Sequence, residues 1–180
     1  MIRIRIHPLL YAFLFFAAIT GKTIDLSLVF FSLLAHEMAH ILTALGFGYR
    51  ATAVELFPFG GVAKVDYALF NDPLAEGVTA IAGPIQSLIL VVISGLCYNL
   101  GGACLLARKL YYINLGLTLF NCLPLFPLDG GRLLRVWLTT SLGYARSARI
   151  TTLCTKTVSA LSLPLLLFLA WKRVVSRSEE

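Results

Sequence analysis

Long apolar runs, separated by short polar or proline-containing segments, make up most of the chain. A helix needs about 20 apolar residues to cross the hydrocarbon core of a bilayer, so these runs predict membrane spans. The runs cover residues 9–19, 24–47, 77–100, 110–125 and 152–171. The first is short for a bilayer. The pattern predicts an all-α polytopic membrane protein with about five to six transmembrane helices.

Residues 51–67 break this pattern. Two β-prone runs flank Pro58-Phe59-Gly60-Gly61, which predicts a short β-hairpin. The segment is too apolar for a solvated loop, so we expect a membrane-associated hairpin that dips in beside other elements. The acidic residues around it are expected to be solvated. They are Glu55, Asp66, Asp72 and Glu76.

Two further segments interrupt or follow the apolar runs. Ala82-Gly83-Pro84 is expected to open or kink the third span, and its small residues suit close helix packing. Residues 130–149 carry four arginines and resemble an interfacial helix and turn.

Composition supports a membrane protein. Of the 180 residues, 58% are hydrophobic and 13% are charged, against about 45–50% and about 25% in soluble domains. This excludes an ordinary cytosolic globular protein, a disordered chain and a collagen-like chain. No basic run with interleaved aromatic residues indicates a nucleic-acid partner.

The formal net charge of +6 is expected to set topology. With the N-terminus inside, nine Lys and Arg residues up to position 156 fall on the inner segments and three on the outer turns. A cytoplasmic N-terminus follows. The basic residues of 172–177 would then lie outside after a fifth span, so the topology of the tail stays open.

The second apolar run contains His36-Glu37-Met38-Ala39-His40. Histidines at i and i+4 lie on one face of a helix and can bind one metal ion, and the glutamate can act as a general base. Three ionisable side chains in an apolar span are costly without partners, which favours a functional site. The alternative is a hydrogen-bonded polar cluster that stabilises helix packing.

A hydrolytic zinc site usually has three protein ligands. His7, the remaining histidine, is expected at the membrane interface. We expect Asp129 as the third ligand, because it lies in an irregular turn with two prolines and two glycines that protein must cover. Its alternatives are a helix N-cap or a partner for Arg132.

Asn121, near the same turn, would hold substrate backbone or a reaction oxyanion, or make a purely structural hydrogen bond.

These pieces together resemble the site-2 protease family of intramembrane zinc metalloproteases. The matching residues are His36-Glu37-x-x-His40, Ala82-Gly83-Pro84 and Asn121-x-x-Pro124-x-x-Pro127-Leu128-Asp129-Gly130-Gly131. Finer features are similar to the stage IV sporulation protein FB branch. They are the short start His7-Pro8-Leu9 through Thr20-Gly21, and Phe57-Pro58-Phe59-Gly60-Gly61 followed by a hydrophobic and charged strand.

The resemblance implies zinc held by His36, His40 and Asp129, with Glu37 as the base, and cleavage of a membrane-associated protein substrate. In the sporulation branch that substrate is a pro-form of a sigma factor, and partner membrane proteins inhibit the protease. The hairpin edge, with Phe59, Gly60 and Gly61 at its tip, could pair with an unwound substrate by strand addition.

Residues 1–180 are expected to form a single integral-membrane metalloprotease domain with no soluble regulatory domain evident. A zinc-binding membrane transporter or metal sensor is the alternative function. It would use the same ligands but leave Glu37 and the hairpin without a role.

Overall fold

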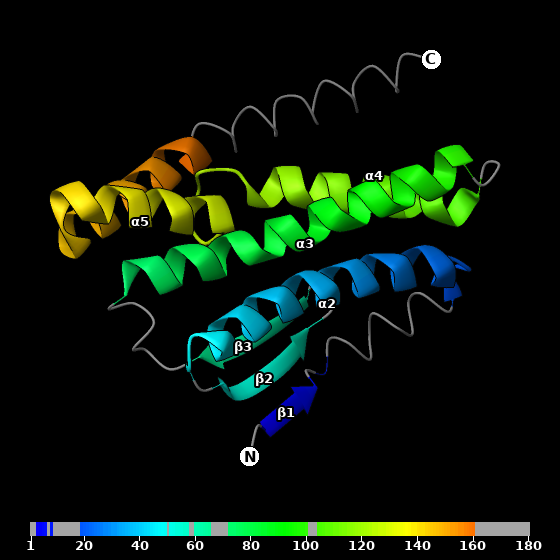
Figure 1. Ribbon diagram of the computed structural model, residues 1–180, viewed down its shortest axis with the longest axis horizontal. Helices are drawn as coiled ribbons and strands as arrows, with labels where there is room; N and C mark the ends of the chain where they lie inside the picture. Colours follow the sequence, from blue (N-terminus) through cyan, green and yellow to red (C-terminus); the bar gives the residue numbers. More distant parts are fainter. Residues whose placement is uncertain are drawn as a thin grey trace, which may run out of the picture.

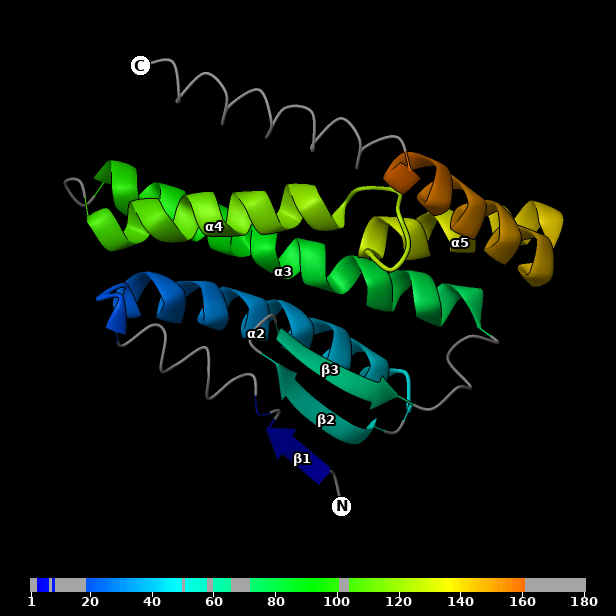
Figure 2. The same cartoon turned by 180° about the vertical axis from the view of Figure 1, so that it is seen from behind.

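Three helices side by side form the body of the molecule (Figures 1 and 2). The computed structural model describes residues 3–6, 8, 19–49, 51–57, 60–65, 72–100 and 104–160. The three helices are α2 (Thr23–Gly46), α3 (Pro73–Leu100) and α4 (Leu105–Asn121). Each contacts the other two, and α3 runs antiparallel to both neighbours. This arrangement brings the second half of α2 against the first half of α3.

Among the described residues, α2 and α3 are the helices long and apolar enough to cross a membrane. They correspond to the second and third expected spans, although α3 begins at Pro73 rather than Gly77. The Asp72 carboxylate accepts the backbone N–H groups of Leu74 and Ala75 at 3.0 and 3.3 Å. An acidic cap followed by proline is a strong helix start, which explains the earlier beginning.

The Ala82-Gly83-Pro84 segment lies inside α3, so it does not open the helix. The fourth expected span corresponds to α4, which ends at Asn121 because Pro124 cannot continue a helix. Of the fifth, residues 152–160 are helical. The rest of the fifth span and nearly all of the first lie outside the described residues.

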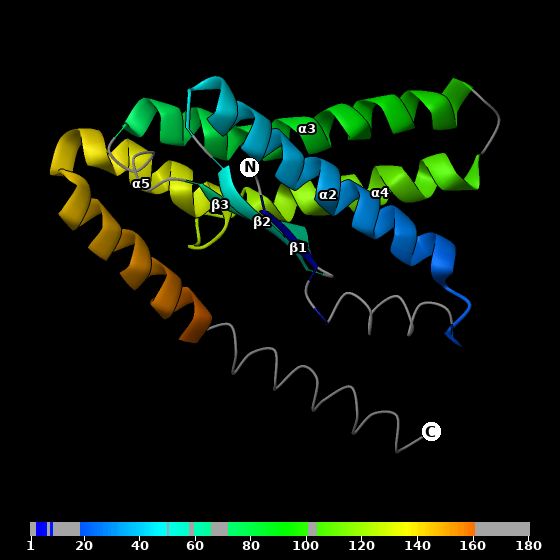
Figure 3. The ribbon, with the colours of Figure 1, turned by 90° about the horizontal axis from the view of Figure 1, so that it is seen from below.

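The strands form a three-stranded sheet in the order β1-β2-β3. Strand β2 (Ala51–Phe57) and strand β3 (Gly60–Val65) pair antiparallel, with Phe57 opposite Gly60, at the position of the expected hairpin. Strand β1 (Arg3–Ile6) pairs parallel with β2 and was not anticipated. Because β3 contacts α2, the sheet lies on the α2 side of the helices (Figures 1 and 2). Seen from below, the strands overlap the helices (Figure 3).

The segment after α4 folds back toward α3. Helix α5 (Asp129–Leu142) packs on α3, and a further helix covers residues 144–160. Gly143 separates them with a φ of 75°, a conformation that favours glycine. Residues 130–149, expected as one interfacial helix and a turn, therefore belong to two helices. The backbone N–H of Phe126 donates to the Thr155 hydroxyl at 2.8 Å, which attaches the 122–128 turn to the later helix.

Candidate metal centre

One face of α2 carries the polar side chains of the site. Ser32, His36 and His40 follow one another at intervals of four residues, and all three are buried. The spacing places them in one row along the helix. The two histidines face α3, because both form hydrogen bonds with residues of that helix, whereas the Ser32 hydroxyl accepts from the Asn114 amide of α4 at 3.0 Å.

Helix α3 orients the two imidazoles. Nδ1 of His40 donates to the backbone carbonyl of Thr79 at 2.7 Å, and Nδ1 of His36 lies 2.8 Å from the Ser87 hydroxyl. A carbonyl can only accept, so the His40 proton sits on Nδ1 and Nε2 remains available as a ligand. Partners of this kind at the second ring nitrogen are a regular feature of metal-binding histidines.

Asp129 completes the group from a distant part of the chain. It is the first residue of α5, and its Oδ2 lies 3.1 Å from Nε2 of His36 and 3.2 Å from Nε2 of His40. One ligand atom from each of the three residues falls within 4.8 Å of the others. Three electron-rich atoms this close repel one another unless a proton or a metal ion lies between them, and two imidazoles with one carboxylate fit zinc.

Asp129 also contacts Arg132, whose guanidinium lies 3.5 Å from the second carboxylate oxygen, Oδ1. The arginine contact and the histidine contacts, weighed as alternatives from sequence, therefore coexist on one carboxylate. Burial alone would raise the pKa of the Asp129 carboxyl, but the imidazoles of His36 and His40 beside it hold that pKa well below its usual range. The carboxylate is therefore ionised, which is the form that binds metal.

Gly83 lets α3 approach the histidines. A Cβ placed on Gly83 would lie 2.6 Å from Nε2 of His36 and closer still to Nε2 of His40. No side chain fits that space without displacing the rings. The backbone of α3 therefore forms one wall of the site, and a glycine is required at this position.

Two further glycines let the turn before α5 pack closely. A Cβ on Gly130 would overlap the carbonyl oxygens of Cys122 and Leu123, and one on Gly131 would overlap the backbone of Leu125 and Phe126. The 122–128 turn thus wraps over the first turn of α5. This packing fixes the position of Asp129 relative to the turn.

The remaining predicted residues have different placements. Glu37 is half-buried beside the first histidine, within electrostatic range of His40, Asp129 and Arg132. The amide nitrogen of Asn121 donates to the backbone carbonyl of Leu117 at 3.0 Å, which is the structural alternative foreseen for it. Gly60 and Gly61 begin β3.

His7 and Phe59 lie outside the described residues. The predicted roles of Asn121 and of the hairpin tip in holding substrate stay predictions.

One expectation about charge was wrong. Glu76 is buried rather than solvated, and its carboxylate forms an ion pair with Arg135 of α5, which is also buried. Thr79 and Ser87 were not foreseen either. Their only sequence signal was a regular spacing with Gly83 along one face of α3, and serines and threonines in an apolar helix are too common for that spacing to single them out.

Comparison with known proteins establishes the family. The family model described as Peptidase family M50 matches residues 26–102 and 99–165. A solved structure of a site-2 protease from Methanocaldococcus jannaschii superposes with a TM-score of 0.69 and 30% identity, covering 97% of this chain and 83% of that one. The chain therefore belongs to peptidase family M50 and has the site-2 protease fold.

Similar proteins with curated names agree with this family assignment. A zinc metalloprotease of Methanocaldococcus jannaschii is 38% identical over 128 residues, which is 68% of this chain and 37% of that protein. Stage IV sporulation protein FB of Bacillus subtilis is 31% identical over 159 residues, which is 86% of this chain and 55% of that protein. The chain thus spans only part of the length of these relatives.

Family and fold give two plain conclusions about this chain. It is an integral membrane protein with at least the two apolar helices α2 and α3. Its His36, His40 and Asp129 form a group that could hold a zinc ion, and the relatives that it resembles include named zinc metalloproteases.

Proposed function

We propose that this protein is an intramembrane zinc metalloprotease that hydrolyses a peptide bond of a membrane-associated protein. One observation carries the proposal. His36, Glu37 and His40 lie on an apolar helix long enough to span a bilayer, and Asp129 approaches the two histidines from the start of α5. A cluster of ionisable groups in such a helix is costly unless it has a function.

Each residue has a role in this proposal. His36, His40 and Asp129 hold the metal, while Ser87 and the Thr79 carbonyl keep the imidazoles in orientation. Zinc, when bound, lowers the pKa of water and polarises a carbonyl group. Glu37 accepts a proton from the attacking water and delivers it to the leaving amine, as a general base and then a general acid.

We further propose a multi-pass topology with about five to six spans and a cytoplasmic N-terminus. The superposition on a site-2 protease over nearly the whole chain supports this topology, as does the excess of basic residues on the inner segments. The sheet then lies at membrane depth beside α2, because β3 contacts that helix. Water reaches the metal from the cytoplasmic side.

Strand addition is the proposed way of holding the substrate. A helical substrate hides its carbonyl groups in hydrogen bonds, so the segment to be cut must unwind. Among the described strands, β3 stands at the edge of the sheet and pairs with β2 alone. An edge strand beside the helix that carries the histidines offers a free row of backbone donors and acceptors to an extended peptide.

The substrate proposed here is a pro-form of a sigma factor made during sporulation, with inhibitory membrane proteins as partners. The support is the resemblance to the sporulation branch and the match to stage IV sporulation protein FB over 86% of this chain. Cleavage of a purified pro-sigma factor in vesicles that contain only this protease would support this assignment. Cleavage of unrelated membrane proteins alone would reject it and leave the protease proposal intact.

The decisive experiment is Glu37→Gln in the full chain. The variant keeps the size and polarity of the side chain but cannot accept the proton, so cleavage should fall by at least ~10²-fold while zinc content stays near one per chain. Asp25→Asn is the matched control, because it makes the same chemical change on the same helix at an ion pair with Lys109. It should leave both quantities unchanged.

The same variant tests the alternative function. A transporter or metal sensor would not need a general base, so Glu37→Gln would leave zinc transport or sensing intact. Near-normal proteolysis by Glu37→Gln would refute the role of this residue as the base. A wild-type protein that binds zinc and cleaves no membrane protein would refute the protease proposal itself.

A further inference from the structure

A buried ion pair joins α3 to α5 close to the metal centre. The side chains of Glu76 and Arg135 are only 3% and 8% exposed. Removing two charges from water carries a large desolvation cost, and a buried pair often stabilises a protein no better than apolar residues of similar size. Such a pair can instead specify one arrangement of the elements that it joins.

Arg135 makes more contacts than the ion pair. Its guanidinium lies 5.6 Å from the ring centre of Phe126 and 5.6 Å from that of Tyr144. Both distances fall within the range of cation–π interactions. Phe126 belongs to the turn that leads into Asp129, and Tyr144 begins the helix after α5. One side chain therefore connects α3 with the segments on either side of α5.

The two helices joined by this pair supply different parts of the metal centre. Helix α3 orients both histidines through Thr79 and Ser87 and forms a wall at Gly83. Helix α5 begins with Asp129. Glu76 precedes Thr79 by one turn of α3 and lies on nearly the same face. The placement of α5 on α3 thus decides where Asp129 lies relative to the histidines.

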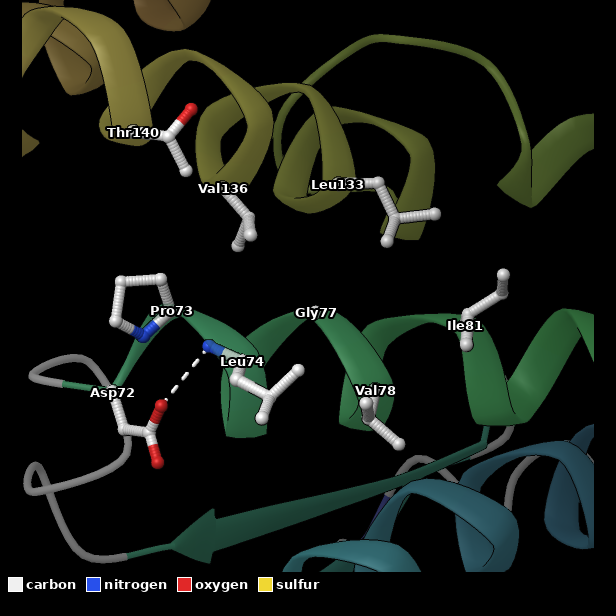
Figure 4. Close-up of a pocket in the computed structure, with 9 residues that line it drawn as sticks. All are labelled: Asp72, Pro73, Leu74, Gly77, Val78, Ile81, Leu133, Val136 and Thr140. Atoms are coloured by element: carbon white, nitrogen blue, oxygen red, sulfur yellow. Dashed lines mark hydrogen bonds between the residues drawn. The ribbon is translucent and has the colours of Figure 1, made fainter.

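Apolar packing between α3 and α5 is incomplete. Beside the ion pair, α3 and α5 face each other across an open groove of about 640 Å³ (Figure 4). Gly77, Val78 and Ile81 line it from α3, and Leu133 and Val136 from α5. Apolar contacts are non-directional and tolerate sliding. The planar guanidinium of an arginine binds a carboxylate in a defined orientation. Such a contact therefore specifies the direction and register of one helix against the other.

We propose that Glu76 and Arg135 are positioning residues that hold Asp129 in register with His36 and His40. This inference rests on the proposed function, since it concerns the same metal centre. It assigns to two residues that touch neither metal nor substrate the task of setting the geometry of the third ligand.

The test compares Arg135→Met, Arg135→Lys and Glu76→Gln in the full-length protein in detergent. Zinc affinity is measured by chelator competition, and ligand geometry by the visible absorption of the cobalt(II)-substituted protein. Arg135→Met and Glu76→Gln should weaken zinc binding by about 10- to 100-fold, the range for residues that orient metal ligands. They should also alter the cobalt spectrum and lower kcat more than they raise KM. Arg135→Lys keeps the positive charge but lacks the planar guanidinium, so each of its losses should be smaller than in Arg135→Met.

Leu133→Ala is the matched control, because it removes apolar packing from the same helix interface without touching the ion pair. It should lower the melting temperature while leaving zinc affinity and the cobalt spectrum of the folded protein unchanged. If Arg135→Met does not fold, the nearly isosteric Glu76→Gln decides the question alone.

Wild-type zinc affinity and cobalt spectra in the ion-pair variants, with only a lower melting temperature, would overturn the proposal. So would equal losses of zinc affinity in Leu133→Ala. Both results are distinct from failure of the proposed function, which would appear as a wild-type protein that binds zinc without proteolysis.

Discussion

Replacing Gly83 with alanine should damage the metal centre while sparing the fold. The new Cβ would lie 2.6 Å from Nε2 of His36, and ordinary contact begins at 3.4 Å, so the imidazole would have to move by about 0.8 Å. Metal–ligand distances vary by only about 0.2 Å in sound sites, so the bond cannot survive such a shift unchanged. Overpacking costs about 1–3 kcal/mol, which corresponds to a loss of zinc affinity of roughly 5- to 150-fold.

Gly116→Ala on α4 is the control, since a Cβ there meets nothing within 4 Å. Alanine in an open helix position stabilises by up to about 1 kcal/mol relative to glycine. Gly116→Ala should therefore raise the melting temperature slightly and bind zinc normally. Both variants are assayed by zinc content after dialysis, chelator competition and thermal unfolding in detergent. Wild-type zinc affinity in Gly83→Ala would show that the backbone of α3 does not lie against the histidines.

Three other predictions concern the ligands and the hairpin. Asp129→Ala should lose zinc on dialysis and lose proteolysis, because it removes one of three protein ligands; full zinc occupancy would exclude it as a ligand. Ser87→Ala should weaken zinc binding by about 10-fold or more, as measured by chelator competition, since the partner of Nδ1 of His36 is lost. A proline at Val62 or at Val65 of β3 removes one backbone donor, and the two donors point in opposite directions across the strand. One variant should lose cleavage while retaining zinc, and unchanged cleavage in both would reject strand addition.

The sequence by itself determined the parts of this protein that follow from local periodicity. Histidines four residues apart share a helix face in any α-helix, so the spacing alone identified His36 and His40 as a pair. The apolar lengths of α2 and α3 identified them as candidate spans. The prolines predicted a turn after the fourth span, although α4 ends at Asn121 rather than at Leu125. The hairpin followed from two β-prone runs around a Pro-Phe-Gly-Gly tip.

Strand β1 shows where a local signal was present but supported two interpretations. Arg3, Ile4, Arg5 and Ile6 alternate between charged and apolar residues, which is the period of a strand. The same residues also look like the basic flank of a first span. Only the parallel pairing with β2, which begins at Ala51, decided between the two.

Tertiary structure alone decided which distant residues meet. Asp129 was a plausible ligand from its turn, but its approach to the histidines depends on how α5 lies on α3. The partnership of Ser87 with His36, the need for glycine at position 83 and the burial of Glu76 with Arg135 depend on the rotation and register of α3 against its neighbours. Periodicity specifies which residues share a face of one helix, whereas packing between helices selects the partner that each face meets.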